Sequence, residues 1–126
     1  MALTFDVDGE APRLSEGPGY ARRLTTLSQG RFGPVRGLGR VLGLLAELEV
    51  TATFYVPGHT ADQHPGAVEA IVAGGHEIGH HGYLHRGTDA LDAAAQRAER
   101  AGERRAPPQA WPGKARGHLG ASCTSW

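Results

Sequence analysis

Runs of strand-like and helical residues alternate along the first hundred positions of the chain. Segment 3–8 is rich in β-branched and aromatic residues, ends in two carboxylates and stops at Gly9. This pattern predicts a short strand followed by a turn. Residues 50–56 form a second run of this kind, and residues 76–79 predict a brief extended piece.

Helical spacing separates these strands. Apolar residues recur three and four positions apart over 37–49, which predicts a helix with one apolar face. A second helix is predicted to open at His64-Pro65-Gly66 and to close at Gly74-Gly75, because glycine tolerates the left-handed conformation that ends helices. The alanine- and arginine-rich stretch 88–101 predicts a third.

The resulting order β-α-β-α-β-α predicts an α/β fold with parallel strands and crossover helices. Open sheets and (β/α) barrels both fit this order. A complete eight-fold barrel takes about 250 residues, so this chain of 126 residues supplies less than half of one. The prediction is about three β/α units of an incomplete barrel.

Two segments lack a regular apolar period. Residues 11–36 are polar and interrupted by many glycines and prolines, which predicts a long loop with one helical turn. Residues 103–126 also lack a period and predict an irregular tail. The predicted organisation is therefore a partial domain at 1–102 and a tail at 103–126.

Composition narrows the function classes. The formal net charge is zero, with 13 basic and 13 acidic residues, so nucleic acid and anionic membrane surfaces are not expected partners. The single cysteine, Cys123, excludes a disulfide within the chain and a cysteine-based zinc knuckle. No signal peptide or membrane-spanning run is visible, and the sequence as written predicts a cytoplasmic protein.

Two carboxylates stand at the end of the first predicted strand. Side chains two apart in a strand point to the same side, so Asp6 and Asp8 should converge at the carboxyl end, where α/β folds place their sites. One carboxylate could bind a metal ion while the other serves as a base. The alternative is a solvated turn or a helix cap.

Histidines cluster after the third predicted strand. His81 and His85 are four apart, so one helical turn would place both rings on one face, ready to share a divalent ion. A surface or capping role is the alternative. An overlapping motif, His76-Glu-Ile-Gly-His80, matches the H-E-x-x-H signature of zinc metalloproteases. Glycines before, inside and after this motif disfavour the regular helix that a protease site requires.

Three segments together resemble the polysaccharide deacetylase family, the NodB-homology group or carbohydrate esterase family 4: 4–10 (T-F-D-V-D-G-E), 52–58 (A-T-F-Y-V-P-G) and 75–85 (G-H-E-I-G-H-H-G-Y-L-H). The resemblance implies a distorted (β/α) barrel that removes acetyl groups from chitin, peptidoglycan or xylan, with zinc or another divalent metal. It also implies that Asp6 is the general base and that Asp8, His81 and His85 are the metal ligands.

The chain departs from the common family pattern at two positions, with Val7 inserted in the first motif and Gly82 where serine or threonine is usual. The D-x-D-G-E spelling resembles a branch that holds peptidoglycan deacetylase-like proteins and also metal-independent allantoinase and cyclic imide hydrolase relatives. The substrate is therefore expected to be an acetylated polysaccharide or a small amide. Family members often act at the cell envelope.

The family's third, fourth and fifth motifs, which include an arginine, an Asp-Trp pair and a Leu-x-His general acid, are not recognisable. This predicts a chain altered by truncation or frame shift, with impaired activity and self-association through the incomplete barrel. The alternative function is a non-catalytic metal-binding fragment.

Overall fold

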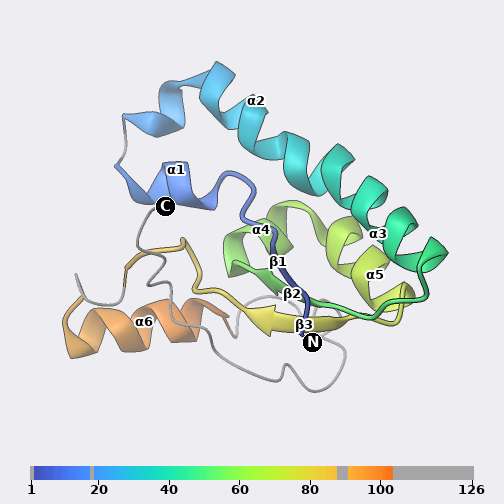
Figure 1. Cartoon of the computed structure of the whole chain (residues 1–126). Coiled ribbons are helices and arrows are strands. Elements are labelled where there is room, and N and C mark those ends of the chain that lie inside the picture. Colours follow the sequence, from blue (N-terminus) through green and yellow to red (C-terminus); the bar gives the residue numbers. More distant parts are fainter. Residues whose placement is uncertain (1, 18, 88–90, 104–126) are drawn as a thin grey trace.

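A three-stranded parallel sheet forms the centre of the molecule (Figure 1). The structure is a computed structural model that describes residues 2–17, 19–87 and 91–103. Strands β1 (Thr4–Asp6), β2 (Thr53–Val56) and β3 (Glu77–His80) pair in the order β1-β2-β3. The predicted parallel α/β arrangement is confirmed. The predicted irregular tail falls almost entirely outside the described residues, so the boundary at 102 stays a prediction.

The three predicted helices are present. Helix α3 (Leu38–Glu47) follows β1 in the chain after the segment 7–37, and α5 (Pro65–Ala73) lies between β2 and β3. Gly75 has a φ of 76°, which confirms the predicted glycine stop after α5. Helix α6 (Ala93–Glu103) begins five residues later than predicted, and residues 88–90 are outside the described part.

The prediction of a loop over residues 11–36 was wrong. This segment forms α1 (Ala11–Ser15), a 3₁₀ turn η1 (Tyr20–Arg22), α2 (Leu24–Phe32) and a π-helical stretch η2 (Gly33–Gly37) that leads directly into α3. Its prolines gave the misleading signal. Pro12 stands in the first turn of α1, where a missing N–H costs nothing, and Pro34 stands where α2 passes without a break into the π-helical stretch η2.

One glycine in this segment has a packing role. A Cβ atom at Gly30 would lie 2.7 Å from the carbonyl oxygen of Gly9 and 3.2 Å from Cα of Glu10. Helix α2 therefore approaches the turn after β1 backbone to backbone, which only glycine permits.

A short helix that the sequence analysis missed follows β2. Helix α4 (Gly58–Gln63) starts immediately after Pro57, in a stretch for which no helix was predicted. Its six residues are too few to show a helical period, and the Pro-Gly pair that opens it is an ordinary turn signal.

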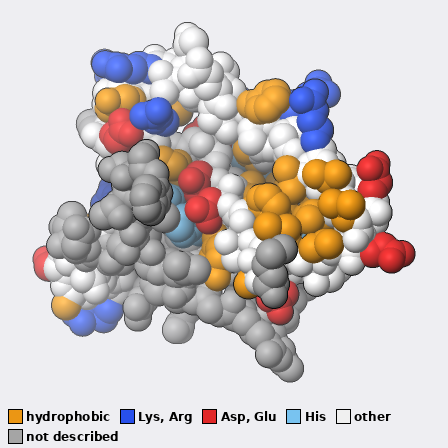
Figure 2. Space-filling view, viewed as in Figure 1, with side chains coloured by type: hydrophobic (Ala, Val, Ile, Leu, Met, Phe, Trp, Pro, Cys, Tyr) orange, Lys and Arg blue, Asp and Glu red, His pale blue; other side chains and the backbone are white. Residues whose placement is uncertain are grey.

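The core lies between the sheet and the helices. Phe54, Val56 and Ile71 are almost fully buried, and the rings of Phe5 and Phe54 stack with centroids 5.2 Å apart. Large apolar side chains are also exposed, among them Leu44, Leu48 and Val50 around the end of α3. Figure 2 shows hydrophobic side chains gathered on one side of the molecule.

Among the described strands, β1 and β3 are both sheet edges. Unpaired strand edges and exposed apolar surface favour association with another polypeptide segment. The expected self-association agrees with this and stays a prediction. None of the described helices has the length and apolar character needed to cross a bilayer.

The burial of α5 gives a stability test. Ile71 is fully buried and its neighbour Val72 is 38% exposed, so the two positions form a matched pair on one helix. Ile71→Ala should lower the free energy of unfolding by about 2–5 kcal/mol, whereas Val72→Ala should change it by at most about 0.5 kcal/mol. Urea titrations followed by circular dichroism measure both. Equal losses would show that α5 packs through a different face.

Candidate metal centre

The parallel register brings residues from two distant segments to one end of the sheet. Asp8 follows β1, and His81 and His85 follow β3, with β2 between the two strands. Phe5 pairs with Phe54 and Phe54 with Ile78, so the carboxyl ends of β1 and β3 finish level with each other. Among the described residues, Asp8, His81 and His85 form the one group of three potential metal ligands.

The donor atoms of this group face one another. Nε2 of His81 lies 3.7 Å from Oδ1 of Asp8, and Nε2 of His85 lies 3.8 Å from Oδ2 of Asp8. These distances are too long for hydrogen bonds. One donor atom from each residue falls within 4.8 Å of the others. The two imidazole rings meet edge to face, with centroids 4.5 Å apart.

The histidines do not occupy a helical turn, so that expectation was wrong. They lie in the irregular segment after β3, in which Gly82 and His85 both have positive φ, 74° and 59°. A bend at residues 83–84 lies between them, and the two rings stand side by side. The four-residue spacing of the two histidines predicted that their rings would pair. The backbone between them is not helical, and it includes two residues with left-handed conformation.

The site holds buried polar atoms without partners. Oδ1 of Asp8 and both ring nitrogens of His81 are buried, and no hydrogen-bond partner for them is present in the described structure. Burial raises the pKa of Asp8 above its usual value, and although the His85 and His81 side chains act in the opposite direction, the Asp6 charge adds to the rise. Buried polar groups without partners lower the stability of the fold. Their presence here therefore indicates a role in binding or chemistry and not in folding.

Asp6 lies near this group without joining it. It is the last residue of β1 and is exposed, while the intervening Val7 is buried. A pocket of about 240 Å³ runs along this edge, lined by Asp6, Asp8 and mainly apolar neighbours from β1, β2 and α3. The two carboxylates are therefore close at one edge of the sheet.

The metalloprotease interpretation is incompatible with the structure. The H-E-x-x-H segment forms β3 and the residue before it, so His76 and His80 are not on one face of a helix. Nδ1 of His76 accepts a hydrogen bond from the Ala52 N–H at the opposite end of the strands, and Nδ1 of His80 accepts one from the Gly82 N–H.

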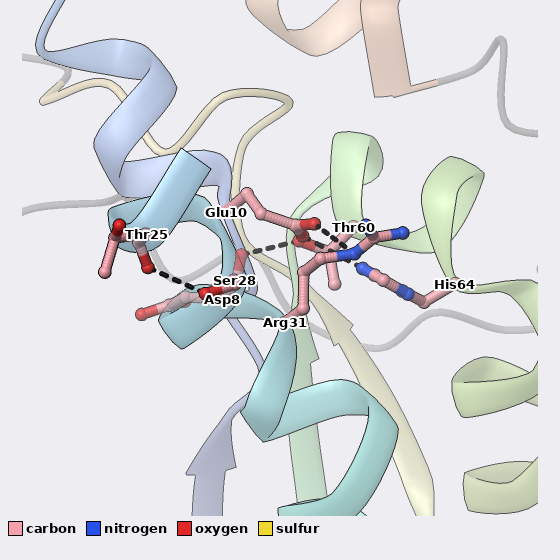
Figure 3. A network of polar contacts seen from close by, with 7 residues as sticks. All are labelled: Asp8, Glu10, Thr25, Ser28, Arg31, Thr60 and His64. Carbon is pink, nitrogen blue, oxygen red and sulfur yellow. Dashed lines mark hydrogen bonds and ion pairs between the residues drawn. The ribbon is translucent and has the colours of Figure 1, made fainter. Parts of the chain in front are cut away.

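A second polar network supports the turn that carries Asp8, and sequence reasoning missed it (Figure 3). Glu10 is buried, and its carboxylate lies 2.9 Å from Nε2 of His64 and 3.2 Å from Nε of Arg31. The Thr60 hydroxyl donates a 2.6 Å hydrogen bond to the Asp8 carbonyl oxygen. Glu10 and His64 are 54 positions apart, so no local pattern could have paired them.

Comparison with known proteins identifies the family of the chain. The family model described as polysaccharide deacetylase matches residues 32–115. The match includes His81 and His85 and begins after Asp8.

Relatives and a solved structure agree with this match. A peptidoglycan deacetylase of Helicobacter pylori is 36% identical over 67 residues, covering 53% of this chain and 23% of the relative. A peptidoglycan deacetylase-like protein of Gibberella zeae is 31% identical over 98 residues, covering 76% of this chain and 29% of the relative. The chain thus spans less than a third of either relative.

The crystal structure of a Mycobacterium smegmatis protein assigned as a polysaccharide deacetylase superposes with a TM-score of 0.81 and 42% identity, over 86% of this chain and 38% of that one. The three-stranded sheet is accordingly part of the (β/α) barrel of such proteins. The family match, the relatives and the fold agree with one another, and the chain therefore belongs to the polysaccharide deacetylase family.

Proposed function

We propose that Asp8, His81 and His85 hold a divalent metal ion, zinc in the first instance, and that the site hydrolyses acetyl groups on an N-acetylated or O-acetylated polysaccharide. The observation that carries the proposal is the convergence of three donor groups, two of which, Asp8 and His81, have buried polar atoms without hydrogen-bond partners in the described structure. A dication would satisfy Oδ1 of Asp8 and one ring nitrogen of His81 together.

The donor set suits a catalytic zinc ion. Zinc takes imidazole nitrogen and carboxylate oxygen at about 2.0–2.2 Å, and two such ligands in tetrahedral geometry stand ~3.4 Å apart. The distances of 3.7 and 3.8 Å between the Asp8 oxygens and the histidine nitrogens are close to this spacing. Three protein ligands leave a position open for water or substrate, as catalytic zinc sites do. An intact triad also favours the metal-dependent members of the branch over the metal-independent ones.

The proposed chemistry needs a base beside the ligands. When bound, the ion would lower the pKa of a coordinated water and polarise the acetyl carbonyl. Asp6, exposed next to Asp8, accepts the proton of the attacking water as general base. Water oxygen bonds to the carbonyl carbon, the bond from that carbon to nitrogen (or to oxygen in an O-acetyl group) breaks, and the proton that Asp6 took from water passes to the leaving atom, so that acetate and an amine (or alcohol) are released. The aspartate thus moves the proton while the ligands stay fixed.

Support for the substrate class comes from the relatives. Both curated relatives carry peptidoglycan in their names, so acetylated peptidoglycan is the first substrate to test. The expected low activity of this chain rests on the family's later motifs, which are not recognisable in its sequence, and it stays a prediction.

Metal binding is tested by titration. Isothermal titration calorimetry of the chelator-treated chain with Zn²⁺ or Co²⁺ should give a stoichiometry of one metal ion per chain. His81→Ala and His85→Ala should each weaken binding at least 10-fold, because one of the three proposed metal ligands is lost. His76→Gln is the matched control, since His76 lies at the other end of the strands. Binding that survives both alanine variants would contradict the ligand assignment.

The charge on Asp8 gives a pH-dependent prediction. Because burial raises the Asp8 pKa, the folded chain binds the carboxyl proton more tightly than the unfolded chain does. Ionisation of Asp8 therefore lowers the free energy of unfolding at pH values above the raised pKa. This loss disappears as the pH falls through that pKa. In chelator, Asp8→Asn should raise the free energy of unfolding at pH 7, by an amount that shrinks on acidification. Urea titrations at several pH values measure this, and with excess zinc the order should reverse.

Catalysis is tested by acetate release from acetylated chito-oligosaccharide or peptidoglycan with zinc or cobalt present. Any metal-dependent turnover should fall by about 10²–10⁴-fold in Asp6→Asn, which removes the base and preserves its shape. Glu77→Gln, which alters an exposed carboxylate at the start of β3, is the matched control and should retain the wild-type turnover. Metal-dependent turnover that is equal in Asp6→Asn and wild type would remove Asp6 from the mechanism.

A further inference from the structure

Helix α4 contacts both of the irregular segments that carry the proposed ligands. One is the turn 7–10, which carries Asp8, and the other is the segment 81–85, which carries both histidines. The two segments come from different ends of the sheet order and have no regular structure to fix their separation. Whatever lies against both of them sets the distance between their donor atoms.

On the Asp8 side the contact is a buried hydroxyl. Thr60 is completely buried, and its Oγ1 donates to the Asp8 carbonyl oxygen at 2.6 Å (Figure 3). The next residue, Gly9, has a φ of 59°, and a Cβ there would lie 3.0 Å from Oγ1 of Thr60. The turn is therefore seated closely on α4. At the other end of the turn, Glu10 pairs with His64, which lies just beyond the end of α4.

On the histidine side the contacts are two backbone hydrogen bonds and one side-chain bond. The N–H groups of Gly58 and His59 donate to the carbonyl oxygens of Gly82 and Tyr83 at 2.9 and 3.0 Å. The Tyr83 hydroxyl donates to Oδ2 of Asp62 at 3.0 Å. Gly58 permits this approach, since a Cβ there would lie 2.6 Å from Cδ2 of Tyr83.

We propose that Thr60 and the Asp62–Tyr83 pair are positioning residues, which tie both ligand-bearing segments to α4 and so set the spacing of Asp8 from His81 and His85. The inference rests on the proposed metal site. None of these three side chains is among the proposed ligands, so their effect is transmitted through the backbone on which the ligands stand. Partners of this kind outside the ligand set typically change metal affinity by about 10–100-fold when removed.

The test measures Co²⁺ binding to the full chain by its visible absorption. Thr60→Val keeps the size and removes the hydroxyl, and Tyr83→Phe removes only the donor to Asp62. Each should weaken Co²⁺ affinity by about 10–100-fold and shift or weaken the cobalt absorption bands. Thr60→Ser, which retains the hydroxyl, should restore most of the affinity and the wild-type spectrum. This rescue separates positioning from a general loss of stability.

Matched controls lie elsewhere on the chain. Thr53→Val removes a hydroxyl bonded to Glu77 on the sheet surface, and Tyr20→Phe alters a tyrosine whose ring lies beside Arg23. Both should bind Co²⁺ like wild type. Wild-type affinity and spectrum in Thr60→Val and Tyr83→Phe would overturn the inference while leaving the metal site intact. Failure of the wild type to bind Co²⁺ or Zn²⁺ would instead overturn the proposed function.

Discussion

The parallel register of three short strands is the constraint on which the candidate site depends. Asp8 and His81 are separated by more than seventy positions in the sequence, yet each comes within two residues of a strand end. They meet because β2 aligns its two neighbours, Thr4 with Thr53 and Thr53 with Glu77. A slip of one residue in either pairing would turn alternate side chains to the wrong face of the sheet. Packing of Phe54 and Val56 therefore holds the register that the ligands need.

Regular structure ends before the chemistry begins. The strands deliver the chain to one edge, but the donor groups stand on a turn and on a segment with two left-handed residues. Such segments have few contacts of their own, so their geometry depends on what packs against them. Here a six-residue helix and a buried Glu10–His64 pair lie beneath them. The positions of the donor groups thus depend on polar contacts, and the stability of the fold depends on apolar ones.

The sequence predicted much of this fold because most elements have a local signature. Residues 50–56 form a β-branched and aromatic run, residues 37–49 have a helical period, and glycine marks the end of α5 at Gly75. The spacing paired Asp6 with Asp8 and His81 with His85, and the family resemblance then implied that Asp8 joins the two histidines. The helices between 11 and 36 were missed because Pro12, Pro34 and Gly30 were interpreted as breakers. Pro12 is harmless in the first turn of α1, and Gly30 is required by a contact with Gly9, 21 positions earlier, that no local pattern reveals.

That close approach of α2 has a consequence for sequence variation. Helix α2 has no buried side chains among its nine residues, and it meets the Asp8 turn through backbone atoms at Gly30. Most positions of the helix are therefore free to change under drift or in a designed library without disturbing the site. Residues 30 and 31 are the exceptions, because any side chain at position 30 would push the helix away from Gly9 and Arg31 pairs with the buried Glu10. The least conspicuous residue of this helix is thus one whose identity the fold requires.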